Sequence, residues 1–140
     1  MEKRFKIMTG FIIMIALVCA YFWPTLRMEV ANSAHYTEQD KREYNFYTPD
    51  ILKTMPRISA RYTFDFANIA GPAKHVYAMK FYDTAVTDEL EKYLSERGYK
   101  ETKCDFDSVC WSNNDPQEAI YIDKLKGENN VIVQVVYTFS

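Results

Sequence analysis

The stretch ISARYTFDF, residues 58–66, alternates apolar and polar side chains along its whole length. This period of two predicts a β-strand with one buried face and one face in water. The turn residues AGPA at 70–73 follow it. The next stretch, HVYAMKFYD at 75–83, predicts a second strand. We therefore expect these two strands to pair as a hairpin.

The segment 87–97 predicts a helix. Thr87 is a suitable N-cap residue, and Asp88 and Glu89 lie in the first turn, where the helix dipole favours negative charge. Gly98 is expected to adopt a left-handed conformation just after the helix ends. The apolar stripe of this helix recurs at helical spacing and consists of Val86, Leu90, Tyr93 and Leu94.

Four short strands are expected after this helix, separated by the turn-rich segments NNDPQ and KGENN. Their approximate bounds are 99–106, 109–112, 119–125 and 131–139. The last of them, VIVQVVYTF, is apolar on both faces, which places it near the middle of a sheet. The predicted fold class is α+β, with an N-terminal transmembrane helix followed by a small, mostly antiparallel sheet covered by one helix.

The transmembrane helix is predicted from residues 7–26, which carry no charged side chain. As a helix, a run of this length reaches about 30 Å, the thickness of the hydrocarbon core of a bilayer. Three basic residues, Lys3, Arg4 and Lys6, precede it. The positive-inside rule therefore predicts that residues 1–6 lie in the cytoplasm and that the chain after the helix is exported.

Tyr21, Phe22 and Trp23 close the apolar run and are predicted to lie at the membrane–water interface. Pro24 is expected to help end the helix. A cleaved signal peptide is the main alternative, because cleavage after Ala20 would fit the small-residue rule. A lipoprotein is disfavoured because the residue before Cys19 is a valine. A buried core helix is disfavoured because the run has no polar face. We favour the retained anchor.

The basic-then-apolar start is typical of a bacterial inner-membrane protein, with one membrane pass and the C-terminal domain in the periplasm. Cys104 and Cys110 lie in the exported part, where an oxidising compartment would allow them to form a disulfide. Two free buried thiols are the alternative. A zinc site is disfavoured because no CxxC motif or histidine cluster accompanies them.

Residues 27–56 read as a polar spacer with short helices, and residues 57–140 as the extracytoplasmic α+β domain. Three aromatic residues in the spacer, Tyr44, Phe46 and Tyr47, have two interpretations. They form an exposed contact surface, or they pack back on the domain. We favour packing.

Composition and motifs exclude several functions. The chain has 17 basic and 19 acidic residues, a net charge of −2, which argues against nucleic acid as a partner. Its 4 glycines leave no Gly-rich phosphate loop, and no catalytic motif such as GxSxG or HExxH is present. His35 and His75 are expected to be ordinary surface or half-buried residues. We therefore expect no metal, no cofactor and no enzymatic activity.

Asp105, Asp107 and Asp115 form an acidic edge around the predicted disulfide. They are the candidate partner-binding residues, because surface carboxylates steer association with a basic partner. The simpler interpretation is a set of hairpin turns rich in Asp and Asn. Calcium binding is disfavoured, because the glycine and the final glutamate of an EF-hand loop are missing.

The short basic start, the single anchor ending in YFWP, and the small exported α+β domain with a disulfide resemble the plan of the colicin M immunity proteins. The resemblance implies a toxin-neutralising role and assigns no functional residue. The function expected from the residues themselves is a membrane-anchored, non-enzymatic periplasmic binding domain. Its expected partners are the lipid bilayer, through the helix, and another protein. A small envelope enzyme that uses carboxylates is the second alternative.

Overall fold

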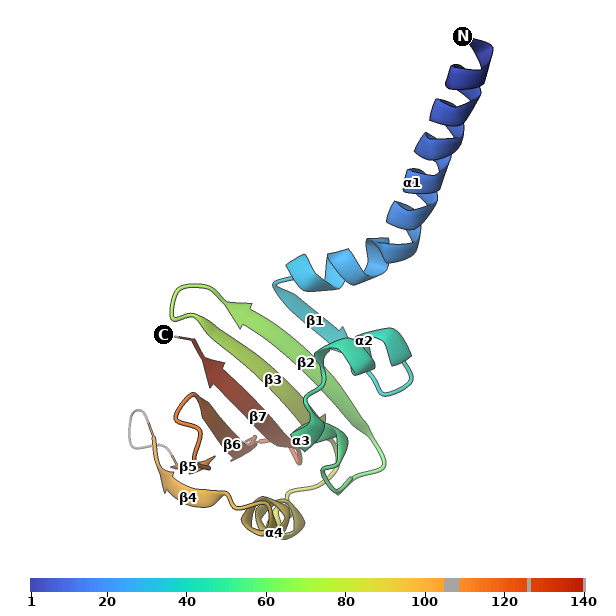
Figure 1. Ribbon diagram of the computed structural model, residues 1–140. Helices are drawn as coiled ribbons and strands as arrows, with labels where there is room; N and C mark the ends of the chain where they lie inside the picture. Colours follow the sequence, from blue (N-terminus) through green and yellow to red (C-terminus); the bar gives the residue numbers. More distant parts are fainter. Residues whose placement is uncertain (105–108, 126, 140) are drawn as a thin grey trace. The chain divides into compact units, whose positions relative to one another are not determined.

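The computed structural model describes residues 1–104, 109–125 and 127–139 (Figure 1). The chain divides into two compact units, Met1–Ala31 and Asn32–Ser140. The first is the helix α1 and the second contains the whole sheet.

Helix α1, Glu2–Val30, is long enough and apolar enough to cross a membrane. None of its most apolar window is buried, which argues against the core-helix interpretation. The helix does not end at Pro24 as expected but continues through it to Val30. A proline inside a helix removes one backbone hydrogen bond and bends the helix, and α1 is bent towards its C-terminal end (Figure 1).

The second unit is a single antiparallel sheet with the strand order β1-β2-β3-β7-β6-β5-β4. With its helices, it confirms the α+β class. The last strand, β7, lies between β3 and β6, as its two apolar faces predicted. The strands are β1 (Ser33–Tyr36), β2 (Tyr62–Ile69), β3 (Lys74–Phe81), β4 (Lys100–Lys103), β5 (Val109–Ser112), β6 (Glu118–Lys124) and β7 (Val131–Thr138).

The chain order explains this arrangement. Strands β2 and β3 form the predicted hairpin, with Ile69 opposite Lys74. Helix α4, Asp88–Glu96, then carries the chain to the far edge of the sheet at β4. From there β5, β6 and β7 return step by step until β7 pairs with β3. Every pairing is therefore antiparallel.

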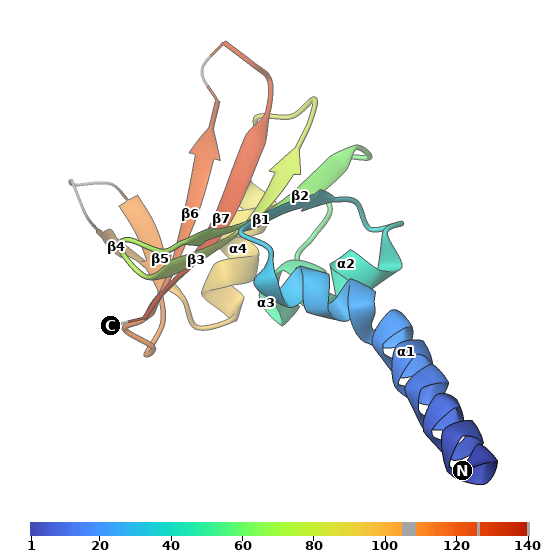
Figure 2. The same cartoon turned by 90° about the horizontal axis from the view of Figure 1, so that it is seen from above.

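Three helices pack on one side of the sheet (Figures 1 and 2). Besides the expected α4, they are α2, Lys41–Tyr47, and α3, Asp50–Lys53. Their side chains bury one face of β2, β3, β7 and β6. The fully buried core contains Leu52, Leu90 and Leu94 from the helices and Phe64, Met79, Phe81, Val131, Val133 and Val135 from the sheet.

Residues 32–56 of the segment interpreted as a spacer belong to the second compact unit, and residues 27–31 belong to the first. Within the segment, Ser33–Tyr36 form the edge strand β1, paired with β2. The ring of Tyr47 stacks on Phe66 at 4.7 Å, and Tyr36 stacks on Phe64 at 5.5 Å. The aromatic residues of this segment thus pack back on the sheet, except that Phe46 remains 41% exposed.

The structure joins Cys104 and Cys110 by a disulfide, at the end of the β4–β5 hairpin. Such a bond fits an oxidising compartment. The remaining cysteine, Cys19, is free and exposed on α1.

Candidate functional site

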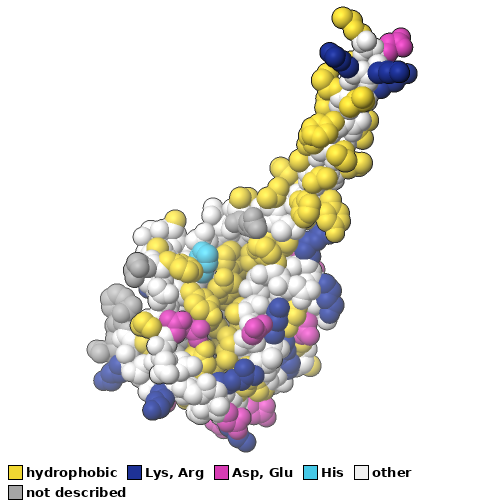
Figure 3. All heavy atoms as spheres, in the orientation of Figure 1, with side chains coloured by type: hydrophobic (Ala, Val, Ile, Leu, Met, Phe, Trp, Pro, Cys, Tyr) yellow, Lys and Arg dark blue, Asp and Glu magenta, His cyan; other side chains and the backbone are white. Residues whose placement is uncertain are grey.

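On the helix-covered side of the sheet, hydrophobic side chains gather in a hollow, with acidic side chains and a histidine at its margins (Figure 3). Four half-buried residues from separate parts of the chain meet at one end of this face. We call them the tyrosine hollow: Tyr77, Tyr99, Glu118 and Tyr137.

The sheet register brings Tyr77 and Tyr137 together. On β7 the side chains of Val131, Val133 and Val135 are buried under the helices, and Tyr137 continues the same face. Tyr77, on β3, lies opposite Val135 of β7. The two tyrosine rings are 5.8 Å apart and nearly perpendicular, at 80°. Together they form an aromatic corner that is only partly covered.

Glu118 is the first residue of β6 and lies opposite Tyr137 in the register. The Tyr99 hydroxyl donates a hydrogen bond to Glu118 Oε1, and the Tyr137 hydroxyl lies close enough to this carboxylate for it to raise the pKa of Tyr137. Burial, and then the nearby Glu118, raise the pKa of both tyrosines well above the ordinary value of 10.0. Both hydroxyls therefore stay protonated, and that of Tyr99 donates to Glu118.

The turn at the end of α4 positions Tyr99. Gly98 has the expected positive φ of 88°. The Tyr99 amide donates a hydrogen bond to the Leu94 carbonyl at 3.0 Å, which caps the C-terminal end of the helix. At the other end of α4, Thr87 occupies the predicted N-cap position, although its side chain makes no capping hydrogen bond. This tight ending directs the chain from α4 back to the sheet, where Tyr99 meets β6.

His75 belongs to the aromatic cluster beside the hollow. Its ring lies 4.7 Å from Phe139, 5.6 Å from Phe66 and 6.4 Å from Tyr77, all in edge-to-face arrangements. It is half-buried, as expected for an ordinary histidine. The contacts extend the aromatic surface from the hollow towards the β2–β3 turn.

One of the three candidate partner-binding residues lies near the hollow. Asp115 is exposed in the turn before β6, where its Oδ1 accepts the Gln117 amide at 2.9 Å. Its charge contributes to the raised pKa of Tyr137, after burial and Glu118. Asp105 and Asp107 lie outside the described residues.

The aromatic residues predicted to lie at the membrane interface are all exposed on α1. The rings of Tyr21 and Phe22 are in edge contact at 5.1 Å. Trp23 is 58% exposed.

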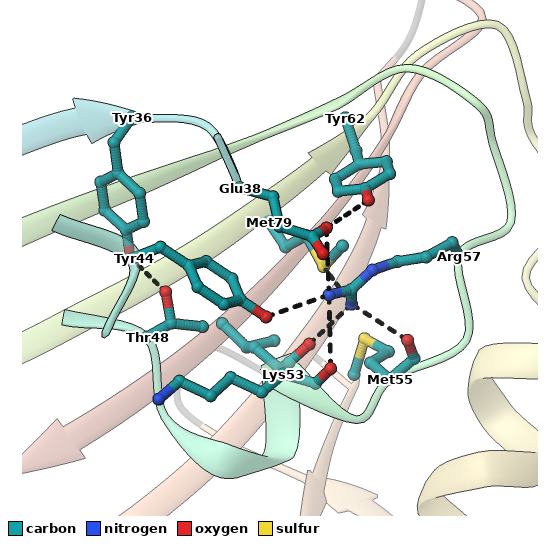
Figure 4. Close-up of polar contacts among 10 residues, drawn as sticks. Tyr36, Glu38, Tyr44, Thr48, Lys53, Met55, Arg57, Tyr62 and Met79 are labelled. Atoms are coloured by element: carbon teal, nitrogen blue, oxygen red, sulfur yellow. Dashed lines mark hydrogen bonds and ion pairs between the residues drawn. The ribbon is translucent and has the colours of Figure 1, made fainter. Parts of the chain in front are cut away.

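A second polar cluster surrounds Arg57 (Figure 4). One guanidinium nitrogen donates to the carbonyls of Leu52 at 2.8 Å and Met55 at 3.0 Å. The other donates to Tyr44 Oη at 3.3 Å and lies 3.6 Å from a Glu38 carboxylate oxygen. Because its donors are used within the chain, we interpret Arg57 as a structural clamp for the segment after α3.

The opposite face of the sheet has a shallow groove of about 240 Å³. Small aliphatic side chains, including Ala67, Val76 and Ala78, line it. The charged side chains at its margins are paired: Asp65 accepts from His35 Nδ1 at 2.6 Å, and Lys80 lies 3.9 Å from Glu128. Among the described residues that line this groove, both charged side chains are paired.

Within residues 1–104, 109–125 and 127–139, no group of three or more His, Cys, Asp or Glu side chains could hold a metal ion. This chain matches no protein-family model, and no curated protein or solved structure is significantly similar to it.

Sequence patterns predicted the strands that carry the hollow but not the hollow itself. Tyr77 and Tyr137 stood in the predicted strands as ordinary core positions. Their role depends on where the helix cover ends, which no local pattern reports. A weak signal was a glutamate at the start of a strand whose next two residues on that face, Ile120 and Ile122, are apolar.

Proposed function

We propose that this chain is a membrane-tethered, non-enzymatic binding domain that engages another protein in the bacterial periplasm. In this proposal α1 crosses the inner membrane once, with the N-terminus in the cytoplasm. Helix α1 has the length and apolar character for such an anchor, and the Cys104–Cys110 disulfide fits an oxidising compartment. Tethering would raise the effective concentration of the domain for partners near the bilayer.

The tyrosine hollow is the observation that carries this proposal. Tyrosine rings that are apolar on their faces and polar at the hydroxyl are enriched at protein interfaces. Here Tyr99 and Tyr137 lie beside one carboxylate and Tyr77 packs against the ring of Tyr137, all half-buried, on a face that also carries the exposed ring of Phe139. Such a mixed aromatic and acidic surface favours protein binding.

The hydrogen bonding of the carboxylates favours binding over carboxylate chemistry. A hydrolytic pair would need two carboxyl groups free to exchange protons across a substrate. Glu118 instead accepts the Tyr99 hydroxyl, and Asp115 accepts a backbone amide in its own turn. Both groups are thus used as hydrogen-bond acceptors.

Site-specific photo-crosslinking in cells tests the proposal. A photoreactive phenylalanine analogue at Phe139, which is 50% exposed and contacts the aromatic cluster, would report a bound partner. The matched control is the same analogue at Val86, which is 63% exposed. We expect a discrete adduct with an envelope protein from position 139 and none from position 86. Identical patterns at both positions would contradict the proposal.

Exchanging α1 for an unrelated single-pass anchor separates a tethered binder from an accessory subunit assembled through its helix. A tethered binder keeps the adduct at position 139 after the exchange, because the hollow makes the contact. An accessory subunit loses it.

The immunity role implied by the resemblance is one specific form of the proposal. It predicts that cells expressing the chain survive a bacteriocin that acts in the periplasm. Equal killing with and without the chain, over a panel of such toxins, would remove this form while leaving the binding domain itself intact.

A further inference from the structure

The geometry points to a specific chemistry for the partner: we infer that the tyrosine hollow receives a basic side chain, lysine or arginine, of the bound protein. The inference rests on the proposed binding function and names what the site recognises. Three features of the described residues support it: the angle between the rings, the sign of the charge and the use of cations elsewhere in the same domain.

The rings of the hollow form a corner. Tyr77 and Tyr137 meet at 80°, and His75 meets Tyr77 at 78°. A sugar ring stacks on a flat, open aromatic surface, whereas a cation is stabilised wherever the faces of aromatic rings converge on it. Perpendicular, half-buried rings therefore favour a compact cationic group over a flat sugar.

The charge of the hollow is negative. Glu118 lies between the hydroxyls of Tyr99 and Tyr137, and Asp115 is close enough to raise the pKa of Tyr137. A carboxylate offers about four acceptor positions, and the Tyr99 hydroxyl uses one of them. The remaining positions suit the N–H donors of an ammonium or a guanidinium group, which form stronger hydrogen bonds to a carboxylate than neutral donors do.

Other tyrosine rings of this domain already hold cations. Arg61 lies 4.4 Å from the ring centre of Tyr82, and Arg97 lies 4.8 Å from that of Tyr93. Lys53 and Arg57 similarly cover Tyr44 and Tyr62. Among the residues that the structure describes, no lysine or arginine lies over the rings of Tyr77, Tyr99 or Tyr137. The hollow thus combines tyrosines and a carboxylate in an arrangement that elsewhere in the chain is completed by a basic side chain.

A peptide titration tests the inference with the full-length chain in lipid nanodiscs. The probe is an acetylated, amidated glycine–serine peptide with one central arginine. Its matched control carries citrulline, which keeps the shape of arginine but is neutral. Binding is followed by NMR of ¹³C-labelled tyrosine rings, with the signals assigned by single Tyr→Phe variants. We expect the Tyr77 and Tyr137 signals to shift with the arginine peptide, and the citrulline peptide to bind about tenfold more weakly.

Two variants locate the binding. Glu118→Gln keeps an acceptor for Tyr99 and Tyr137 but removes the charge, and we expect about tenfold weaker binding of the arginine peptide. The control, Glu101→Gln, makes the same charge change on the exposed strand β4 and should leave binding unchanged. Tyr77→Leu removes one ring face and should weaken binding about fivefold. Thermal unfolding of each variant reports whether the fold is kept.

Equal affinity for the arginine and citrulline peptides, or an unchanged affinity in Glu118→Gln, would overturn the inference. So would tyrosine shifts caused by an N-acetylglucosamine disaccharide but not by the arginine peptide, because that result would identify a glycan site. If the peptide fails to bind while the adduct at position 139 persists, the binding function stands and its basic chemistry is wrong. If both fail, both proposals fall.

Discussion

Arg57 illustrates how a single side chain can fix an irregular segment. One side chain gathers the carbonyl groups at the end of α3 and just after it. The Arg57 guanidinium donates to the carbonyls of Leu52, Lys53 and Met55, at 2.8, 3.3 and 3.0 Å. It also stacks over the ring of Tyr62 at 5.1 Å. A planar group with five donors can make these contacts at once, which a lysine cannot.

We predict that Arg57→Met destabilises the domain by about 2–3 kcal/mol, because the carbonyls of Leu52, Lys53 and Met55 and the Glu38 carboxylate each lose a charged donor. Chemical denaturation of the full-length chain in detergent measures this change. The control is Arg61→Met, because the Arg61 side chain is 65% exposed. This substitution should lower the free energy of unfolding by no more than about 0.5 kcal/mol. Equal effects of the two substitutions would refute the clamp.

Tyr36 predicts a loss of stability at alkaline pH. Its ring is 3% exposed, and its hydroxyl shares a hydrogen bond of 2.8 Å with Thr48 Oγ1. Burial is the main reason that its pKa is raised from 10.0 to about 12. A group whose pKa is higher in the folded state contributes stability that is fully present below its unfolded pKa. That contribution is lost as the pH rises from 10 towards 12.

The free energy of unfolding of the native chain should therefore fall between about pH 9 and about pH 11.5. The free energy of unfolding of the Tyr36→Phe variant should fall by about 1–2 kcal/mol less over the same range. Denaturation curves at several pH values measure the difference. Parallel pH profiles for the two chains would show that Tyr36 titrates normally.

At the scale of elements, side-chain patterns predicted the helices and strands that depend on local interactions. The run in residues 131–139 that is apolar on both faces predicted β7, and the capping signals predicted α4. Strand β2 starts at Tyr62, later than the alternation from Ile58 suggested. The Ser59 hydroxyl donates to the Tyr82 carbonyl and accepts a hydrogen bond from the Arg61 amide. Hydrogen bonds from this side chain therefore replace backbone pairing between strands at this position. Strand β1 was not predicted because SAHY is too short to show a period.

Helix α4 ends just before Gly98, as the glycine at this position predicted. A Cβ at this position would meet only Asn113 Oδ1, at 3.9 Å, so space is available and the cost is in the backbone. We predict that Gly98→Ala costs about 1–2 kcal/mol and weakens the contact of Tyr99 with Glu118. Gly71→Ala, also in open space and without a positive φ, is the control. Thermal unfolding compares them, and equal melting temperatures would contradict the prediction.

The disulfide at the end of the β4–β5 hairpin is expected to stabilise the domain by about 2–3 kcal/mol, by restricting the unfolded chain. The double variant Cys104→Ala, Cys110→Ala should show this loss in denaturant, and a reducing agent should no longer affect it. Cys19→Ser is the matched control, because Cys19 is free. A native chain whose stability does not change on reduction would show that the bond adds nothing.

At the scale of the whole molecule, the sequence predicts the fold class but not the site. The tyrosine hollow combines β3, the turn after α4, the start of β6 and the end of β7, and it exists only because β7 pairs with both β3 and β6. Alternation specifies which face a residue takes but not which strands become neighbours. The class of fold was therefore predictable, whereas three of the four hollow residues had no distinguishing signal and Glu118 had only a weak one.

The most direct test of the account is the membrane topology of the full-length chain in intact cells. Gly71→Cys places a thiol in the exposed β2–β3 turn, and Lys3→Cys places one before the apolar run; both are made in the Cys19→Ser background. After the outer membrane is permeabilised, a membrane-impermeant maleimide should label position 71 and not position 3. The labelled chain should sediment with membranes at its full mass. Labelling of position 71 only after lysis, or a soluble product that begins at Tyr21, would contradict a tethered domain outside the inner membrane.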